Sequence, residues 1–382
     1  MNSQKWMSQN FFIFFITWGI FLPYWTGWLV SAKGLSVAVA SLIMGLATII
    51  RGLSSMFAYP ILSKFLSQEK ILLGGTVLSL LVSLIYIPSS SLPALFVITM
   101  VFSAIYPSLL AAIESMASIL VQSEGIHYGR SRSYGSLGYI VAVLLISVLT
   151  GYFGDGAILY GMIFGLSLLF IMRFFPAPAV LTSKPVKQEQ KDKQSMRSLW
   201  KENGFPIMLL VVFLLQGAHA SYYNYGYLYL QKVDINSYFI GVLLNIAIVA
   251  EILFLARADR YFSSWRPSSL LLIAAIGSSV RWVLYLFPYK WVFIASQTLH
   301  ALSFAMAHYA FIRYLTEQLP AEQHSNAQGL YSALAMSFST AILTLGAGFL
   351  YEIKPEFAFL SMLVCTVPTI GIIIGMRKKY GF

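Results

Sequence analysis

The sequence predicts an all-α membrane protein with 12 transmembrane helices, arranged as two pseudo-symmetric six-helix halves. Of its 382 residues, 58% are hydrophobic and only 10% are charged, whereas soluble domains are about a quarter charged. Apolar segments of about twenty residues, each long enough for one helical crossing, recur along the whole chain. Basic residues gather in alternate loops between these segments, which is the pattern of a multi-pass protein.

Short polar loops separate the expected spans, and one longer polar stretch divides them into two sets of six. The stretch at 177–204 is rich in Lys and Gln and has no hydrophobic periodicity, so we interpret it as a cytoplasmic linker. It separates an N-terminal half, 1–176, from a C-terminal half, 205–382. The expected spans are 11–30, 38–60, 70–88, 93–120, 133–153, 156–175, 206–230, 237–257, 268–287, 290–315, 325–351 and 356–376.

The distribution of Lys and Arg predicts the topology. With both termini cytoplasmic, nineteen of the 25 basic residues lie on the inner side. Four lie on the outer side, and Arg51 and Arg281 fall inside spans. This asymmetry follows the positive-inside rule and accounts for the net charge of +11 without a nucleic-acid partner. The first apolar run, FFIFFITWGIFLPYW, has no A-x-A-like cleavage site after it and is interpreted as a retained span.

The two halves resemble each other faintly at their first spans. FITWGIFLPYWTGWLVSAKG precedes FLLQGAHASYYNYGYLYLQKV by about 198 residues, with Gly19 matching Gly217 and Lys33 matching Lys232. Two parallel six-helix repeats with a site between them are typical of secondary transporters.

Two charged residues near a short loop form the first candidate site. A charge at mid-bilayer costs roughly 2.5–3.5 kcal/mol on insertion scales, so each one needs a reason. Glu114 of the fourth span and Arg132 at the start of the fifth are 18 residues apart, so their helices are antiparallel neighbours. Such a pair can bind a polar substrate. The alternatives are a structural ion pair, or an arginine that extends to the headgroups, as we expect for Arg130.

A second candidate group comes from spans eight, nine and ten: Glu251, Arg281 and His300. A buried carboxylate can hold a proton near neutral pH, and an arginine brought close would drive that proton off. Histidine titrates in the same range. The group can therefore serve a proton path, although a histidine packed against a neighbouring helix is the simpler alternative. His308 lies about 80° round an α-helix and 12 Å further along from His300, so we expect it to serve packing.

Aromatic residues form a third feature, in GIFLPYWTGW of span one and GAHASYYNYGYLY of span seven. Many of these rings belong to interface belts or packing. Those at the centre of the bundle, among them Tyr24, Trp25 and Tyr223, can stack on a flat apolar substrate.

Other classes of protein are disfavoured. The sequence lacks H-E-x-x-H, G-x-x-x-x-G-K-[ST] and G-x-S-x-G, so we expect neither an enzyme nor the ATPase part of a pump. A single cysteine, Cys365, allows neither an internal disulfide nor a thiolate metal site. We expect no cofactor and no metal. A membrane sensor would need an output domain, and no long soluble segment exists to supply one.

With these features the chain resembles the major facilitator superfamily, specifically the 3-phenylpropionate permease group, a relative of lactose permease. The matching pieces include GIFLPYWTGWL, LLQGAHASYY, SSVRW and TLH. The resemblance implies proton symport of a small aromatic carboxylate by a multi-pass protein of the bacterial cytoplasmic (inner) membrane, which contacts lipid and works as a monomer. It also implies that Glu114 and Arg132 hold the substrate, that the stacking ring is Tyr139, and that proton coupling falls on Glu251, Arg281 and His300.

Two departures from lactose permease change these implied roles. Where that protein has an acid three residues after the coupling histidine, this chain has Ser303, so the role of final proton carrier passes to Glu251. The acids of span seven are replaced by the run QGAHASYYNY, which makes His219 and Tyr223 candidate substrate-binding residues. A proton symporter for a sugar or nucleoside is the alternative function, because a neutral substrate could use Glu114 as an acceptor.

Overall fold

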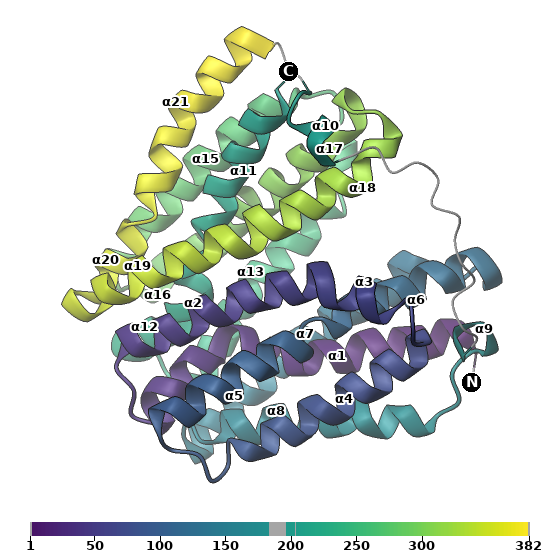
Figure 1. Cartoon of the computed structure of the whole chain (residues 1–382). Coiled ribbons are helices and arrows are strands. Elements are labelled where there is room, and N and C mark those ends of the chain that lie inside the picture. Colours follow the sequence, from purple (N-terminus) through teal and green to yellow (C-terminus); the bar gives the residue numbers. More distant parts are fainter. Residues whose placement is uncertain (1, 183–195, 203, 381–382) are drawn as a thin grey trace. The chain divides into compact units, whose positions relative to one another are not determined.

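The structure, a computed structural model, describes residues 2–182, 196–202 and 204–380, and every regular element in these ranges is helical (Figure 1). Eleven of its helices are long and apolar enough to cross a membrane. This confirms the predicted all-α membrane class. Half of the expected linker at 177–204, residues 183–195 and 203, lies outside the described residues. The spans are Ser3–Ala32, Val37–Leu62, Gln68–Ile85, Leu92–Glu124, Tyr128–Phe153, Ala157–Phe174, Phe205–Lys232, Ser237–Leu255, Pro267–Leu284, Glu322–Ile353 and Pro355–Tyr380.

The chain divides into two compact units. Unit 1 comprises Met1–Ser36, Leu46–Glu189 and Asn236–Gly241, and unit 2 comprises Val37–Gly45, Gln190–Ile235 and Val242–Phe382. The helices up to residue 182 are α1 Ser3–Gly27, η1 Trp28–Ala32, α2 Val37–Leu53, η2 Ser54–Ala58, α3 Tyr59–Leu62, α4 Gln68–Ile85, α5 Leu92–Ile105, α6 Leu109–Glu124, α7 Tyr128–Phe153, α8 Ala157–Ile171, η3 Met172–Phe174 and α9 Ala179–Thr182.

The helices from residue 196 onward include several short or wide-turn pieces. They are α10 Met196–Leu199, α11 Phe205–Gly217, α12 Ala220–Lys232, α13 Ser237–Leu255, α14 Ala258–Phe262, α15 Pro267–Leu284, α16 Lys290–Thr298, η4 Ala301–Met306, α17 Ala307–Gln318, α18 Ala321–Leu330, η5 Tyr331–Phe338, α19 Ser339–Ile353, α20 Pro355–Leu360 and α21 Leu363–Tyr380. Of these, η4 and η5 are π-helices.

Within unit 1, α1 packs along α7 and α8 (Figure 1). Glycines on α7 permit this close approach. A Cβ at Gly138 would collide with the carbonyl oxygen of Phe12, and one at Gly135 would lie 2.7 Å from Cδ2 of Phe15. Small residues let transmembrane backbones come together in this way. As a result, the rings of the first half of α1 lie beside the first turns of α7.

The tenth expected span is not one continuous helix. Residues 290–318 are divided into α16, the π-helix η4 and α17, and this segment is not among the eleven spans. A π-helix uses i→i+5 hydrogen bonds, widens the turn and is frequent at functional sites. Here it begins directly after His300, a residue of the second candidate group, and it contains Ser303.

Unit 2 has an apolar core to which this irregular segment contributes. Buried side chains from α11, α15, α17 and η5 form it, including Val211, Leu215, Leu271, Ala307 and Phe311. Polar residues that lie beside such a core must find partners within the unit.

Candidate functional site

Glu114 and Arg132 form an ion pair in unit 1. Arg132 Nε lies 3.3 Å from Glu114 Oε1, and both side chains are about one-third exposed, at 35% and 33%. The hydroxyl of Tyr128 donates to the second carboxylate oxygen at 2.8 Å. The chain reverses between the two helices because α6 ends on Gly125 in the left-handed region, with φ 66°. The structure thus brings together the two residues that the sequence places across a short loop.

Aromatic rings from α1 cover the guanidinium of Arg132. Its Cζ lies 4.5 Å from the centre of the Phe15 ring and 5.7 Å from that of Phe11. Cation–π contacts of this kind hold an arginine in place without consuming its hydrogen-bond donors. The motifs and charges of the sequence do not indicate Phe11, Phe15 and Tyr128 as site residues. Phe11 and Phe15 are four residues apart on one helix face, and that spacing was the available signal.

Arg281 is the centre of a hydrogen-bond network in unit 2. Its side chain is fully buried. Nη1 lies 2.8 Å from His300 Nδ1 and donates to Ser303 Oγ at 3.2 Å, while Nη2 donates to Gln297 Oε1 at 3.4 Å. An arginine is only a donor, so His300 Nδ1 must accept, and the neutral ring carries its hydrogen on Nε2. That Nε2 lies 3.5 Å from Glu251 Oε2. The imidazole therefore bridges an arginine and a carboxylate.

His219 joins the same network, although the sequence analysis grouped it with the substrate-binding residues. Its Nδ1 lies 3.0 Å from the carbonyl oxygen of Leu215, and its Nε2 lies 3.0 Å from Ser303 Oγ. A carbonyl only accepts, so Nδ1 donates and Nε2 accepts from the serine hydroxyl. Ser303 Oγ thus accepts a hydrogen bond from Arg281 and donates one to His219. The ring of Tyr223, half-buried, stacks on His219 at 6.0 Å.

The positive charge of Arg281 is balanced indirectly. The faces of Tyr222 and Trp282 lie 4.5 and 4.8 Å from its Cζ. Among the described residues, no carboxylate oxygen lies within 4.0 Å of this guanidinium. Burying a charge is costly unless it is paired, and the nearest compensation runs through His300 to Glu251, whose side chain is 23% exposed.

The remaining aromatic candidates divide into two kinds. Tyr24 and Trp25 have no exposed surface: the Tyr24 hydroxyl donates to the carbonyl oxygen of Val143 at 3.2 Å, and Trp25 stacks on Trp28 at 4.3 Å. These contacts favour packing over substrate binding. Tyr139 is half-buried on α7. It lies seven residues, or about 10 Å, beyond Arg132 on the same helix face.

His300 and His308 of the 290–318 segment both stack on the ring of Phe304. The His300 and Phe304 rings are 5.1 Å apart and inclined by 10°, and the Phe304 and His308 rings are 6.5 Å apart and inclined by 10°. The π-helix η4 lies between these two histidines in the chain.

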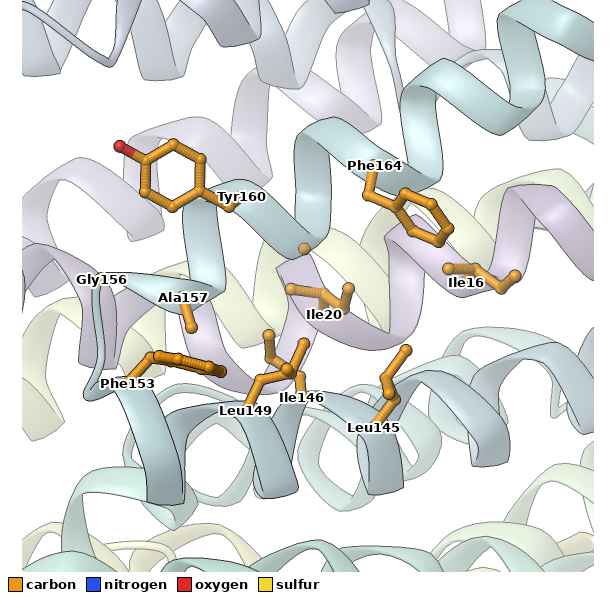
Figure 2. Close-up of a pocket in the computed structure, with 11 residues that line it drawn as sticks. Ile16, Ile20, Leu145, Ile146, Leu149, Phe153, Gly156, Ala157, Tyr160 and Phe164 are labelled. Carbon is orange, nitrogen blue, oxygen red and sulfur yellow. The ribbon is translucent and has the colours of Figure 1, made fainter.

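A cavity of about 450 Å³ lies away from these polar groups, between α1, α7 and α8 (Figure 2). Its walls are apolar: Ile16 and Ile20 of α1, Leu145 and Leu149 of α7, and Phe164 of α8. The Tyr160 hydroxyl points away from the other labelled side chains (Figure 2). A wall of this composition offers neither a charge nor a hydrogen bond to an anion, so we place the candidate site at the two polar groups.

The comparisons with known proteins agree with this architecture. The model of the MFS_1 like family matches residues 5–361, so the chain belongs to that family. It is 27% identical over 378 residues to a protein of Escherichia coli (strain K12) named probable 3-phenylpropionic acid transporter, covering 96% of each chain. It is also 27% identical over 321 residues to the maltose permease of Geobacillus stearothermophilus, covering 81% of this chain and 78% of that one.

Solved structures show the same fold. The crystal structure of the nucleoside transporter NupG matches with a TM-score of 0.82 at 16% identity, covering 100% of this chain and 100% of that one. The crystal structure of the peptide transporter POT in complex with sulfate matches with a TM-score of 0.78 at 11% identity, covering 98% of this chain and 94% of that one. The chain is thus a multi-pass membrane transporter for a small molecule, and it is not an enzyme.

Proposed function

We propose that this protein is a proton-coupled symporter of the bacterial cytoplasmic membrane that carries a small aromatic carboxylate, such as 3-phenylpropionate, by alternating access. The observation that carries the proposal is that two arginines, Arg132 and Arg281, lie against aromatic rings. Arg132 pairs with Glu114, which a substrate anion can replace, and Arg281 reaches Glu251 only through His300. A substrate carboxylate needs a cationic donor, and a phenyl ring needs a flat apolar surface. The name of the Escherichia coli relative supports this substrate class.

Arg132 is the proposed anchor for the substrate carboxylate. It is partly exposed, and its partner Glu114 is held by one 3.3 Å contact. The second Glu114 oxygen is bound by the Tyr128 hydroxyl, so the glutamate keeps a partner when a substrate anion displaces it from the guanidinium. The Phe15 ring at 4.5 Å from the guanidinium, and the half-buried Tyr139 further along α7, provide aromatic surface for the substrate ring.

Glu251 is the proposed proton carrier. In the neutral ring of His300, Nδ1 holds the only lone pair able to bind a proton, and the Arg281 guanidinium occupies it at 2.8 Å. His300 cannot take a proton there while that bond persists. Glu251 lies 3.5 Å from His300 Nε2 and is partly exposed, and a carboxylate can take a proton on either oxygen. His300 and Arg281 would stabilise its ionised form and so promote release of the proton.

A proton symporter for a sugar or nucleoside is the second candidate. It is favoured by the maltose permease relative and by the likeness in fold to the nucleoside transporter. In that case Glu114 would accept hydrogen bonds from substrate hydroxyls, and Arg132 would orient the carboxylate. The two candidate functions have the same fold and the same proton coupling. They differ in the substrate group that binds at the Glu114–Arg132 ion pair.

Transport into liposomes distinguishes the candidates. The purified protein is placed in lightly buffered liposomes with a pH-sensitive dye inside, and 3-phenylpropionate, uridine and maltose are added in turn. Neutral aryl acids cross bilayers unaided, so protein-free liposomes and liposomes with Arg132→Gln serve as controls. Internal acidification by the aryl carboxylate alone, above both controls, is the expected result. Acidification by uridine or maltose would show that the substrate is a nucleoside or a sugar instead of an aryl carboxylate. No response to any of the three would contradict the proposed proton coupling.

A further inference from the structure

A buried chain of polar side chains in unit 2 lies outside the hydrogen-bond network of Arg281. Gln216 Nε2 donates to the Tyr331 hydroxyl at 2.9 Å, and that hydroxyl lies 3.0 Å from His308 Nδ1. Gln216 is 2% exposed and Tyr331 is 4% exposed, whereas His308 is half-buried. The hydroxyl accepts from the amide and therefore directs its own hydrogen to the imidazole. In this arrangement neutral His308 carries its hydrogen on Nε2.

The far end of this chain holds an unused acceptor. Gln216 Oε1 is buried and has no hydrogen-bond partner among the described residues. Rotation of the amide by half a turn exchanges its oxygen and nitrogen, which are told apart only by their partners. The Tyr331 hydroxyl can then donate to Gln216 Oε1 and accept from a protonated His308. The rotation gives up the 3.4 Å contact between Gln216 Nε2 and the carbonyl oxygen of Phe304, and it moves the amide nitrogen to the position where Oε1 has no partner among the described residues.

The proton balance of this reversal is simple. His308 Nδ1 gains one proton and becomes a donor to the Tyr331 oxygen. Tyr331 keeps its own hydrogen, which turns from the imidazole to Gln216. No charge other than the added proton is created, and the imidazolium keeps a hydrogen bond. His300 has no equivalent, because its Nδ1 faces Arg281, which cannot accept.

We propose that His308 is a second proton-binding residue of this transporter, and that reversal of the Tyr331–Gln216 chain accommodates its imidazolium. Its role in transport rests on the proposed proton coupling. Glu251 of α13 is a charged group within electrostatic range of His308 of α17 and of Tyr331 of η5. His308 also shares the parallel ring row with His300 through Phe304.

Histidine NMR tests the inference without a substrate. The full-length chain, labelled with ¹⁵N-histidine, is placed in lipid nanodiscs, and its five histidines are assigned through single His→Gln variants. The ring nitrogens are then followed as the pH is lowered. We expect the His308 signals to change reversibly to those of an imidazolium while the His300 Nδ1 stays unprotonated. A His300 that becomes protonated while His308 remains neutral over the range in which the protein stays folded would overturn the proposal.

The reversal itself is tested with a positioning variant. Gln216→Met removes the group that accepts from Tyr331, so the titration midpoint of His308 should fall by about one pH unit or more. Gln323→Met is the matched control, because Gln323 is equally buried, at 2% exposure, and hydrogen-bonds Glu202 instead. An unchanged midpoint in Gln216→Met would contradict the reversal. The result is independent of the liposome assay: a titrating His308 without substrate-driven acidification would refute the symport and leave the proton site standing.

Discussion

One hydrogen bond joins the Arg281 guanidinium to the His300 imidazole, and only the arginine can donate it. Nη1 and Nδ1 are 2.8 Å apart, and the arginine has no lone pair with which to accept. His300 therefore presents its Nε2 hydrogen to Glu251, 3.5 Å away. In this geometry the ring connects a cation to an anion, and the bond to Arg281 occupies the lone pair with which the neutral ring could take a proton.

A bridge needs an acceptor at one end and a donor at the other, and glutamine supplies both. We expect His300→Gln to retain proton-driven accumulation within a few-fold of the parent protein. His300→Leu offers neither group and leaves the buried Arg281 without that partner, so accumulation should fall about tenfold or more. Uptake of labelled substrate under an imposed pH gradient measures both variants. Equal loss in both would mean that His300 itself titrates during transport.

Glu251→Gln should separate exchange from accumulation. The amide cannot release a proton, so net uptake driven by a pH gradient should be lost. Exchange of internal for external substrate needs no net proton movement and should persist. Glu317→Gln is the control, because Glu317 is exposed and pairs with Arg313 on the same helix, and such pairs contribute little. Unchanged accumulation in Glu251→Gln would remove this residue from the proton path.

Arg132→Gln should weaken transport by lowering substrate affinity. Loss of a charged hydrogen bond of about 1.5–3 kcal/mol corresponds to roughly a 10- to 100-fold loss. Arg130→Gln makes the same chemical change two residues away, on an exposed side chain, and should leave affinity within about two-fold, because surface substitutions have small effects. Competition between labelled and unlabelled 3-phenylpropionate for uptake measures both. Similar affinities in the two variants would show that Arg132 does not hold the carboxylate.

Hydropathy and charge spacing were sufficient to predict the membrane class and the pairing of Glu114 with Arg132. Long apolar runs have one stable outcome in a bilayer, because every backbone group must be hydrogen-bonded within the protein. Two residues 18 positions apart across a short turn are similarly constrained. Eleven of the twelve expected spans coincide with single candidate membrane helices.

The contacts of the other candidate residues could not be predicted. They depend on hydrogen-bond patterns within helices and on which helix face a residue occupies, and residue types do not reveal either. The π-helix after His300 has no sequence signal in ALSFAM, yet it divides the tenth expected span into three pieces. Tyr24 and Trp25 stand in a helix that is apolar on all sides, so the sequence could not tell their buried face from a substrate-facing one. Ser303 replaces an acid, and only its contacts with Arg281 and His219 show what it does.

The close approach of α1 and α7 can be tested through stability. At Gly138 an added Cβ would meet the carbonyl oxygen of Phe12, which is backbone and cannot rotate away. Gly138→Ala should therefore destabilise the protein by about 1–3 kcal/mol, as overpacking does. Gly74→Ala is the matched control: Gly74 lies inside α4, and a Cβ there would have no neighbour within 4 Å. That change should stabilise the helix by about 0.5–1 kcal/mol.

Thermal unfolding in detergent compares the two variants directly, with the midpoint lowered for Gly138→Ala and equal or raised for Gly74→Ala. The separation of helices should also move Phe15 away from Arg132, because the ring lies on α1 beside the same contact. Substrate affinity should then fall in Gly138→Ala and stay unchanged in Gly74→Ala. A Gly138→Ala protein with parental stability and affinity would mean that this contact does not position the Phe15 ring over the guanidinium.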